Sequence, residues 1–136
     1  MDFDRAVKIA TSGLSAQSGR MRVIAENLAN ADSTARTPGG NPYRRKVPTF
    51  TSALDKELGA ETVKLGKVEL DQTDFRSRYE PGHPAADANG YVKYPNVDPL
   101  VEMVDMRQAQ RSYEANLNVI TATRRMLLKT LDILRA

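Results

Sequence analysis

A chain of 136 residues with 40% hydrophobic residues, 6% aromatic residues and no tryptophan has the length of one ordinary domain but few side chains that could fill a large interior. Its net charge of +3 is spread evenly along the chain, and the only local basic cluster is Arg44-Arg45-Lys46, so the concentrated positive face of a nucleic-acid binder is missing. The absence of cysteine excludes disulfides, thiol nucleophiles and cysteine metal sites.

Membrane insertion and cleavable secretion are both disfavoured by the sequence. No apolar run approaches the roughly 20 residues of a membrane span, and the N-terminus lacks the unbroken apolar core of a secretory signal peptide. We therefore expect a chain that does not span a membrane, and that is either cytosolic or exported by another route.

Helix breakers are segregated to the middle of the chain. All seven prolines and six of the eight glycines lie between residues 38 and 99. Because proline costs roughly 3 kcal/mol in a helix interior, the pattern predicts two long helices near residues 4–30 and 99–134.

The first helix is expected to begin at Asp2 or Asp4, whose carboxylates suit a helix N-terminus, and to end at Asn30, which tolerates left-handed geometry. Apolar side chains recur along it every seven residues. This ladder consists of Val7, Leu14, Met21 and Leu28, and Ala10, Gln17 and Ile24 fill the alternating three- and four-residue steps.

The middle of the chain is expected to hold loops and short strands. Turn-forming residues dominate from Ser33 to Pro48. Residues 62–70 alternate apolar and polar side chains about Gly66, which predicts one strand or a tight hairpin, and residues 90–94 form a second candidate strand.

The second helix is expected to open with Asp98 as N-cap and Pro99 at the first helical position. Its ladder consists of Met106, Tyr113, Ile120, Leu127 and Leu134, with Met103, Gln110, Leu117, Arg124 and Leu131 in the alternating steps. Helices with such seams pair and supercoil. The polar residues Gln17, Gln110 and Arg124 on these ladders either fix the register of a pair or simply face water.

The predicted fold class is mainly α, with long N- and C-terminal helices forming an antiparallel coiled-coil pair and a small irregular or β-rich middle segment. Residues 1–32 and 98–136 would each contribute one helix to a coaxial domain, and residues 33–97 would form an extended loop and an outer segment.

The sequence contains no recognisable catalytic or cofactor-binding frame. A single histidine, His83, cannot form the usual zinc clusters without cysteine, and neither a phosphate-binding glycine loop nor a G-x-S-x-G elbow is present. The carboxylates Asp71, Asp74, Glu80 and Asp87 are interpreted as a solvated face. We therefore expect a protein that is not an enzyme and needs no cofactor or metal.

Several segments resemble a known family. They are Asn27-Leu28-Ala29-Asn30-Ala31-Asp32-Ser33-Thr34, Pro38 to Arg45, Tyr79 to Val97, Glu102 to Met106, and Arg111 to Asn116. Together they resemble the axial proteins of the bacterial flagellum, which build the rod, hook and filament junctions. The short length and the Tyr79 to Val97 segment resemble the proximal rod members of that family.

The resemblance implies a structural subunit of the proximal rod of the basal body. Such a subunit would polymerise into a hollow drive shaft that spans the periplasm, transmits torque and encloses the export channel. Implied partners are other rod subunits, the adaptor between the MS ring and the rod, further copies of the chain, and the flagellar type III export apparatus, which exports without a cleavable signal. A distal-rod or hook-like relative is disfavoured because those proteins carry larger middle domains.

The ladders and the resemblance together assign candidate sites. Subunit-interface candidates are Val7, Leu14, Met21, Ile24, Leu28, Met106, Tyr113, Glu114, Leu117, Ile120, Leu127, Leu131 and Leu134. Family-motif candidates are Asn27, Asn30, Thr34 and Asn116, of which the first three would shape the exit from the first helix through hydrogen bonds to backbone. The alternative function is a soluble coiled-coil adaptor or export chaperone that binds partner helices without polymerising.

Overall fold

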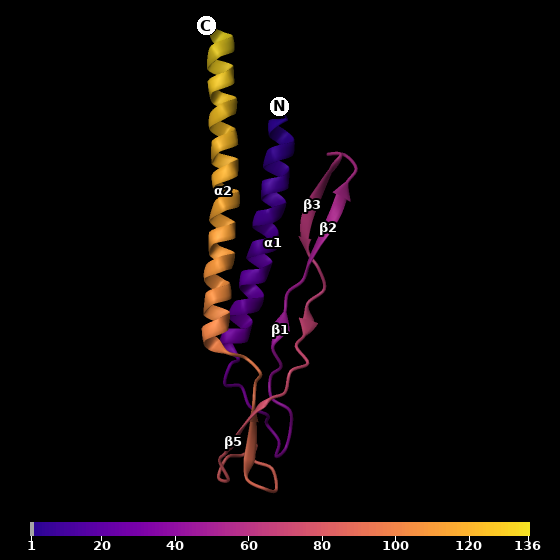
Figure 1. Cartoon of the computed structure of the whole chain (residues 1–136), viewed down its shortest axis with the longest axis vertical. Coiled ribbons are helices and arrows are strands. Elements are labelled where there is room, and N and C mark those ends of the chain that lie inside the picture. The colour runs from indigo at the N-terminus through magenta and orange to yellow at the C-terminus, as the bar shows by residue number, and fades with distance from the viewer. Residues whose placement is uncertain (1) are drawn as a thin grey trace. The chain divides into compact units, whose positions relative to one another are not determined.

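The computed structural model describes residues 2–136 and contains two helices, α1 (Phe3–Ala29) and α2 (Pro99–Arg135), separated in the chain by six strands (Figure 1). The two predicted helices are therefore confirmed to within one residue at each end. They hold 27 and 37 residues, just under half of the chain, so "mainly α" overstates the helical content. Neither helix in residues 2–136 carries an apolar stretch that could cross a bilayer.

The start of α1 is capped as expected, whereas its end is built differently. The Asp2 carboxylate accepts the Arg5 N–H at 3.0 Å. At the other end the backbone and side-chain amides of Asn30 both donate to the Glu26 carbonyl, at 3.1 and 2.9 Å. No residue other than glycine has a positive φ in the described part of the chain, so the expected left-handed ending at Asn30 is wrong. Its side-chain amide satisfies a terminal carbonyl without that turn.

The start of α2 matches the prediction. The Asp98 carboxylate accepts the Leu100 N–H at 3.0 Å, and the Asp98 carbonyl accepts the Glu102 N–H at 3.0 Å. Pro99 is the first helical residue, where a missing N–H leaves no hydrogen bond unmade.

The strands form three antiparallel two-stranded sheets. They pair β1 (Lys46–Val47) with β4 (Glu69–Leu70), β2 (Phe50–Asp55) with β3 (Ala60–Leu65), and β5 (Arg76–Tyr79) with β6 (Tyr91–Tyr94). The longest register runs from Phe50 opposite Leu65 to Asp55 opposite Ala60.

The two strand predictions have different outcomes. The segment 62–70 is interrupted at Gly66, and its two halves pair with β2 and β1, so it is neither one strand nor a hairpin. The strand at residues 90–94 is confirmed as β6. Strands β2 and β5 had no sequence prediction, because FTSALD and RSRY lack a strong alternation of apolar and polar residues.

The chain divides into two compact units, the first built from three segments and the second from two. Unit 1 comprises Met1–Met21, Pro48–Lys67 and Arg107–Ala136, and unit 2 comprises Arg22–Val47 and Val68–Met106. Both helices have residues in both units.

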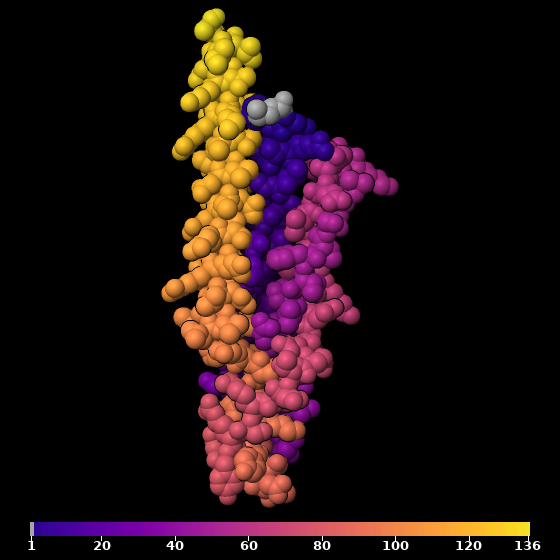
Figure 2. Space-filling view, in the orientation of Figure 1, coloured from indigo at the N-terminus to yellow at the C-terminus, as the bar shows by residue number. Residues whose placement is uncertain are grey.

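In unit 1 the β2–β3 hairpin lies along the N-terminal part of α1 (Figure 2). The Val63 N–H donates to the Ser12 hydroxyl at 3.2 Å, which places the outer edge of β3 against the helix. The buried apolar residues of this unit are all alanines, namely Ala10, Ala16, Ala60 and Ala109. The thin core expected from the composition is therefore made of small side chains that let the elements approach closely.

Two glycines of α1 mark the sites of closest approach. A Cβ at Gly13 would lie 2.7 Å from the Asn116 side-chain nitrogen on α2, and a Cβ at Gly19 would lie 2.7 Å from a methyl group of Leu65 on β3. Glycine weakens a helix by up to about 1 kcal/mol relative to alanine. At Gly13 and Gly19 the weaker helix propensity is accompanied by close packing against α2 and β3.

The inward face of α2 differs from the predicted seam. The predicted seven-residue repeat of α2 faces inward only in part. Met106, Tyr113 and Ile120 are partly buried, but Leu127 and Leu134 are exposed. The residues that complete the inward face are Glu102, Ala109, Asn116 and Thr123, one position before the predicted set Met103, Gln110, Leu117 and Arg124, which is exposed. Small side chains permit the close approach at Gly13, so the more apolar ladder does not face α1.

Unit 2 has its own small core around the β5–β6 hairpin. Ala85, Val92 and Tyr94 pack together there, and the Tyr94 hydroxyl donates to the Glu80 carboxylate at 3.0 Å. This hairpin lies next in the chain to the cap of α2, because β6 ends four residues before Asp98.

Candidate functional site

The Asn27 side chain is the centre of a buried polar network in unit 2. Asn27 is fully buried, and its amide nitrogen donates to the Lys46 carbonyl at 2.8 Å and to the Glu102 carboxylate at 3.3 Å. Its amide oxygen accepts the Tyr43 hydroxyl at 2.8 Å and the Lys46 N–H at 2.9 Å. A side-chain amide has two donors and two acceptor sites, so the hydrogen-bonding capacity of Asn27 is fully used within the chain.

Tyr43 is held in this network in its neutral form. Burial of the phenol, followed by the nearby carboxylates of Glu26 and Glu102, raises the pKa of Tyr43 to about 12. The hydroxyl therefore remains a hydrogen-bond donor to Asn27 throughout the physiological range.

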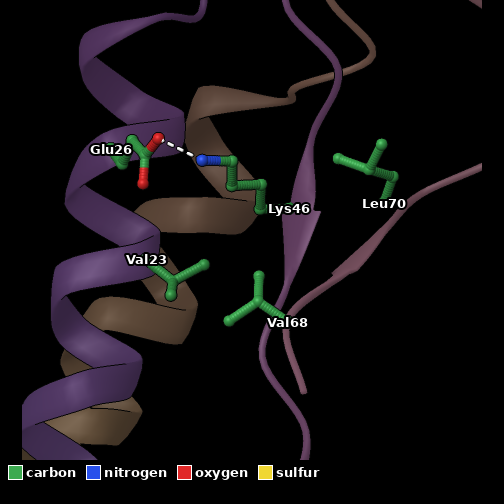
Figure 3. A pocket seen from close by; sticks show the side chains of 5 residues that line it. All are labelled: Val23, Glu26, Lys46, Val68 and Leu70. Atoms are coloured by element: carbon green, nitrogen blue, oxygen red, sulfur yellow. Dashed lines mark hydrogen bonds and ion pairs between the residues drawn. The ribbon is translucent and has the colours of Figure 1, made fainter.

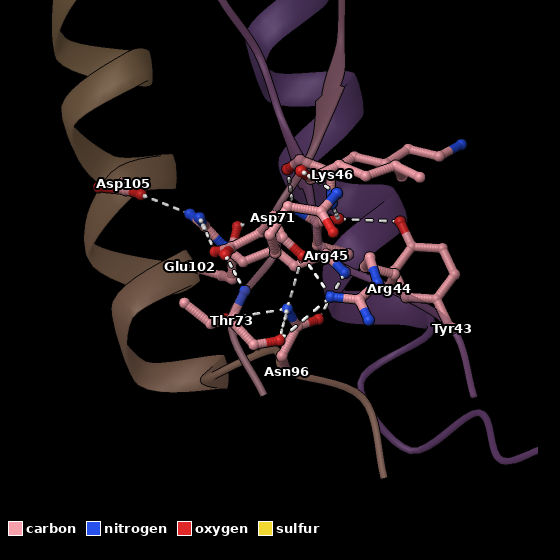
Figure 4. Close-up of polar contacts among 12 residues, drawn as sticks. Tyr43, Arg44, Arg45, Lys46, Asp71, Thr73, Asn96, Glu102 and Asp105 are labelled. Atoms are coloured by element: carbon pink, nitrogen blue, oxygen red, sulfur yellow. Dashed lines mark hydrogen bonds and ion pairs between the residues drawn. The ribbon is translucent and has the colours of Figure 1, made fainter. Parts of the chain in front are cut away.

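Arg45 joins three carboxylates from two different elements (Figure 4). Its guanidinium pairs with Glu102 and Asp105 on α2 and, at 3.3 Å, with Asp71 in the segment after β4. The Glu102 side chain is only 1% exposed, so this is a buried ion pair. Partial burial lowers the pKa of Arg45, but the interactions with Glu102 and Asp71 outweigh burial and raise it, so Arg45 stays charged.

Asn96 ties the segment before α2 to the same network. Its side-chain oxygen accepts the Arg45 N–H at 2.8 Å, and its nitrogen donates to the Asp71 carbonyl at 3.0 Å. The Thr73 backbone N–H and, to a smaller extent, Arg45 lower the pKa of the Asp71 carboxyl, which remains an anion. Residues from four separate segments are thus fixed by one set of hydrogen bonds.

The basic cluster noted in the sequence is engaged inside the chain. Arg44 donates to the Asp71 carbonyl at 2.8 Å, and its guanidinium lies 4.2 Å from the centre of the Phe75 ring. Arg45 holds its three carboxylates, and Lys46 pairs with Glu26. The cluster is therefore part of the internal polar network, and its charges are used to hold the chain's own segments together.

A shallow pocket of about 270 Å³ lies beside this network, where β1 and β4 face α1 (Figure 3). Its apolar wall consists of Val23, Val68 and Leu70, and the Lys46–Glu26 ion pair lies at one side. The ion pair occupies both charged groups of the lining, and the rest of the lining is aliphatic. The pocket therefore has the chemistry of a packing surface.

The residues considered for catalysis in the sequence make hydrogen bonds that stabilise nearby turns and strands. His83 accepts the Ala85 N–H through Nδ1 at 3.0 Å, Glu80 accepts the Tyr94 hydroxyl, and Asp87 accepts the Tyr91 N–H at 2.9 Å. Among residues 2–136 no group of three or more histidine, aspartate or glutamate side chains is placed to hold a metal ion.

The predicted interface residues fall into two classes by exposure. Ile24 is buried, and Val7, Leu14, Met21, Leu28, Met106, Tyr113 and Ile120 are partly buried. Glu114, Leu117, Leu127, Leu131 and Leu134 are exposed. The second class leaves a large part of its surface accessible to a neighbouring molecule, whereas the first is mostly covered by this chain.

The motif candidates are dispersed. Asn27 makes its expected bonds to backbone, and Asn30 bonds the Glu26 carbonyl and accepts the Ser33 hydroxyl at 3.0 Å. Asn116 lies in unit 1, where it donates to the Ser112 carbonyl at 3.1 Å and packs over Gly13. Thr34 is partly buried.

Sequence reasoning missed five members of the network, Tyr43, Arg45, Asp71, Asn96 and Glu102. Two signals were available. Glu102 is a charged residue among apolar neighbours in the first turn of α2, and Tyr43, Arg45 and Asn96 lie in segments that resemble the flagellar family. The interpretation of Asp71 as part of a solvated face is wrong, because its carboxylate is mostly buried against Arg45.

Comparison with known proteins gives the family. The family model for "Flagella basal body rod protein" matches residues 8–36, and the model for "Flagellar basal body rod FlgEFG protein C-terminal" matches residues 88–133. Relatives named flagellar basal-body rod protein FlgC include those of Agrobacterium fabrum, Salmonella typhimurium and Bacillus subtilis. The Agrobacterium fabrum protein is 56% identical over 131 residues, covering 96% of this chain and 94% of the relative. The Salmonella typhimurium protein is 50% identical, covering 92% of each chain, and the Bacillus subtilis protein is 42% identical, covering 94% of this chain and 95% of its own. With this identity over nearly the whole of each relative, the chain belongs to the FlgC family of flagellar basal-body rod proteins.

Proposed function

We propose that this rod subunit polymerises with its neighbours into a hollow shaft that crosses the periplasm, transmits torque and encloses the export channel. Family membership supports the rod. The observation that supports polymerisation is the surface of α2, on which large apolar side chains are exposed at residues 100–104 and again at positions from Leu117 to Leu134. Exposed apolar surface of this extent is typical of a site that another molecule covers.

We propose that α1 and α2 act as an antiparallel coiled-coil pair. Contacts along the two helices support this pairing because they occur in opposite order. Phe3 and Val7 share a pocket wall with Ile120 and Leu127, Gly13 meets Asn116, and Arg20 donates to Gln108 at 3.1 Å. In unit 2, Asn27 then meets Glu102.

This pairing suggests which residues form the helical domain and which lie outside it. Residues 1–32 and 98–136 would form the coaxial helical domain, and residues 33–97 would face outward. The network around Asn27 supports this arrangement because it ties the loop at Tyr43 and Lys46 to both helices of unit 2. A fixed exit angle from α1 would give each copy the same shape in a polymer.

The partners and the route follow from the same proposal. The chain would contact other rod subunits, further copies of itself and the adaptor between the MS ring and the rod, and it would reach them through the type III export apparatus without a cleavable signal. The exposed residues Glu114, Leu117, Leu127, Leu131 and Leu134 are the predicted contacts that a neighbour reaches most directly. The proposed role is structural, and no enzymatic step is assigned.

The test is electron microscopy of basal bodies isolated from cells that lack this chain, with swimming scored alongside. The proposal expects immotile cells whose inner rings carry no rod. Intact rods and normal swimming would reject the proposal and leave the coiled-coil adaptor or export chaperone in its place.

A truncated chain sharpens this test. Ending the chain before Leu131 removes Leu131 and Leu134, so the shortened protein should be synthesised but absent from rods. Normal rods assembled from the shortened chain would contradict the assignment of those residues to a subunit contact.

A further inference from the structure

One of the seven asparagines, Asn89, is followed directly by a glycine. In an Asn-Gly pair the side-chain amide is especially open to attack by the next backbone nitrogen, because glycine has no side chain to block the approach. Asn89 is exposed and lies in the loop between β5, which is labelled in Figure 1, and β6. The position therefore combines a reactive pair of residues with access to water.

The fold requires the glycine of this pair. Gly90 has a φ of 84°, in the left-handed region that residues with a side chain rarely adopt. A Cβ at this position would lie 2.9 Å from the Tyr79 ring and 3.1 Å from the Pro81 Cβ. A bulkier residue, which would slow the attack on Asn89, therefore cannot replace Gly90 without strain in the hairpin.

In the folded chain a β-turn holds the attacking nitrogen. The turn places Asp87 first and Gly90 fourth, and the Gly90 N–H donates to the Asp87 carbonyl at 3.0 Å. The Asp87 carboxylate accepts the N–H groups of Asn89 and Tyr91, both at 2.9 Å. Short polar side chains at the first position of a turn commonly bond to the backbone in this way. These bonds fix the peptide groups on both sides of Gly90.

The attack on Asn89 needs movements that this turn prevents. The Gly90 nitrogen must lose its proton and rotate toward the Asn89 side-chain carbonyl, yet its N–H is bonded to Asp87 and the neighbouring peptide groups are fixed. A backbone group held in this way becomes reactive only when the local structure opens. The Asn89 side chain is therefore open to water, whereas the nitrogen that would attack it is withheld until the turn opens.

We propose that Asn89 is a site of spontaneous deamidation whose rate is set by the folding of the β5–β6 hairpin. In the open chain the Gly90 nitrogen bonds to the Asn89 Cγ and the Cγ–Nδ2 bond breaks. The side-chain nitrogen leaves as ammonia and carries away the proton lost by the Gly90 nitrogen. The resulting succinimide ring takes up one water molecule. Cleavage of its Cγ–N bond gives aspartate, whereas cleavage at the backbone carbonyl gives isoaspartate.

The two products differ in their effect on the hairpin. Aspartate keeps the length of the backbone, so the turn from Asp87 to Gly90 can still close. Isoaspartate carries the chain through its Cβ and Cγ, which adds one carbon to the main chain before Gly90. Because Gly90 is buried and packed against Tyr79 and Pro81, the longer backbone displaces it from the position that the hairpin requires. This limits how long a copy can wait unfolded, a property that the proposed structural role does not include.

Mass spectrometry of the purified full-length chain measures the deamidation. One sample is kept folded and a second is kept unfolded in urea, at the same pH and temperature, and the peptide that contains residue 89 is followed over time. Fragmentation of this peptide distinguishes isoaspartate from aspartate. We expect conversion of Asn89 to be several-fold faster in the unfolded chain. Equal rates in the two samples would overturn the proposal that folding sets the rate.

Asn118 is the internal control, because it is exposed in the folded chain and is followed by a valine. In the unfolded sample Asn89 should react faster than Asn118, and equal rates at the two residues would overturn Asn89 as the site. Gly90→Ala should slow the conversion of Asn89 several-fold in the unfolded chain, where the hairpin plays no part. A rate that Gly90→Ala leaves unchanged would overturn the attack by this backbone nitrogen.

Asp87→Ala tests the turn in the folded chain. The substitution removes the carboxylate that holds the N–H groups of Asn89 and Tyr91, so conversion of Asn89 in the folded variant should approach its rate in the unfolded wild type. Circular dichroism under the same conditions verifies that the variant keeps its helices. A folded Asp87→Ala chain that reacts as slowly as the folded wild type would overturn the role of the turn.

A refolding measurement on the wild type tests the consequence without any substitution. The unfolded chain is aged in urea and then diluted, and size-exclusion chromatography separates the molecules that refold from those that do not. Isoaspartate at residue 89 should be enriched among the molecules that fail to refold, whereas aspartate should be shared by both fractions. An equal share of isoaspartate in the two fractions would overturn the effect on the hairpin.

Discussion

The Asn27 side chain and the Lys46 backbone are joined by two hydrogen bonds, one in each direction. The Asn27 amide nitrogen donates to the Lys46 carbonyl at 2.8 Å, and the Lys46 N–H donates to the Asn27 amide oxygen at 2.9 Å. A helix side chain thus pairs with β1 as a neighbouring strand would, and it fixes the position of β1 on α1 at a single residue.

Replacing Asn27 with alanine should therefore be costly. Asn27→Ala leaves the partly buried backbone groups of Lys46 and the hydroxyl of Tyr43 without this partner, and we expect a loss of about 2–4 kcal/mol in the free energy of unfolding. Urea denaturation followed by circular dichroism measures it. Asn118→Ala, at an exposed asparagine of α2, is the matched control and should change stability by less than about 0.7 kcal/mol. Equal effects of the two substitutions would contradict the role given to the network.

The Arg45–Glu102 pair should behave as a coupled unit. Arg45→Ala leaves a buried carboxylate without its main cation, so we expect a destabilisation of about 3 kcal/mol. The double variant Arg45→Met/Glu102→Met removes both charges and should lose less than the sum of the two single methionine variants. Lys8→Ala, which removes the exposed pair with Asp4, is the control and should leave the free energy of unfolding nearly unchanged. Additive effects at Arg45 and Glu102 would show that the pair is not coupled.

The close approach at Gly13 predicts a stability effect that depends on Asn116. Gly13→Ala should gain little or nothing, because the new methyl group meets the Asn116 side chain. In an Asn116→Ala background the same substitution should recover up to about 1 kcal/mol of helix propensity. Ser15→Ala, at an exposed position of α1, should give the same small gain in both backgrounds. A Gly13→Ala effect that is identical in both backgrounds would mean that this contact does not limit the packing.

Tyr43 predicts a specific alkaline instability. Its pKa is about 12 in the folded chain, raised by burial and then by Glu26 and Glu102, against about 10 in an unfolded chain. A folded pKa above the unfolded one means that the stabilisation is complete below pH about 10 and is lost as the pH rises from about 10 to 12. Free energies of unfolding measured across pH 8–11 should fall more steeply for the wild type than for Tyr43→Phe. Parallel curves would exclude a role of the Tyr43 proton.

Local sequence signals were sufficient to predict the helices. Proline segregation and the Asp98-Pro99 cap depend only on neighbouring residues, so both helix spans could be predicted, as could the strand ending at Tyr94. The pairing of the two halves of the 62–70 segment could not be predicted, because β2 lacks a strand signal of its own and β1 lies more than 20 positions before β4.

The residues of α2 that face α1, and the members of the polar network, could not be predicted for a related reason. Hydrophobicity alone favours Leu117 over Asn116, yet Asn116 faces α1 because a glycine opposite it permits a shorter distance. Glu102 and Arg45 are 57 positions apart, and each is an ordinary charged residue in its own segment. Only the fold brings them together, so neither the burial of the pair nor its energy could be deduced from local patterns.

The small sheets and the polar network differ in the length of the loop that must close before their residues can meet. Strands β2 and β3 are joined by a four-residue turn, whereas the bond between Asn27 and Glu102 closes a loop of 75 residues. Short loops close fastest and at the lowest entropic cost. We therefore expect a newly emerged chain to gain its hairpins first and the exit geometry of α1 last, so a copy becomes fit to join its neighbours only at the final step of its own folding.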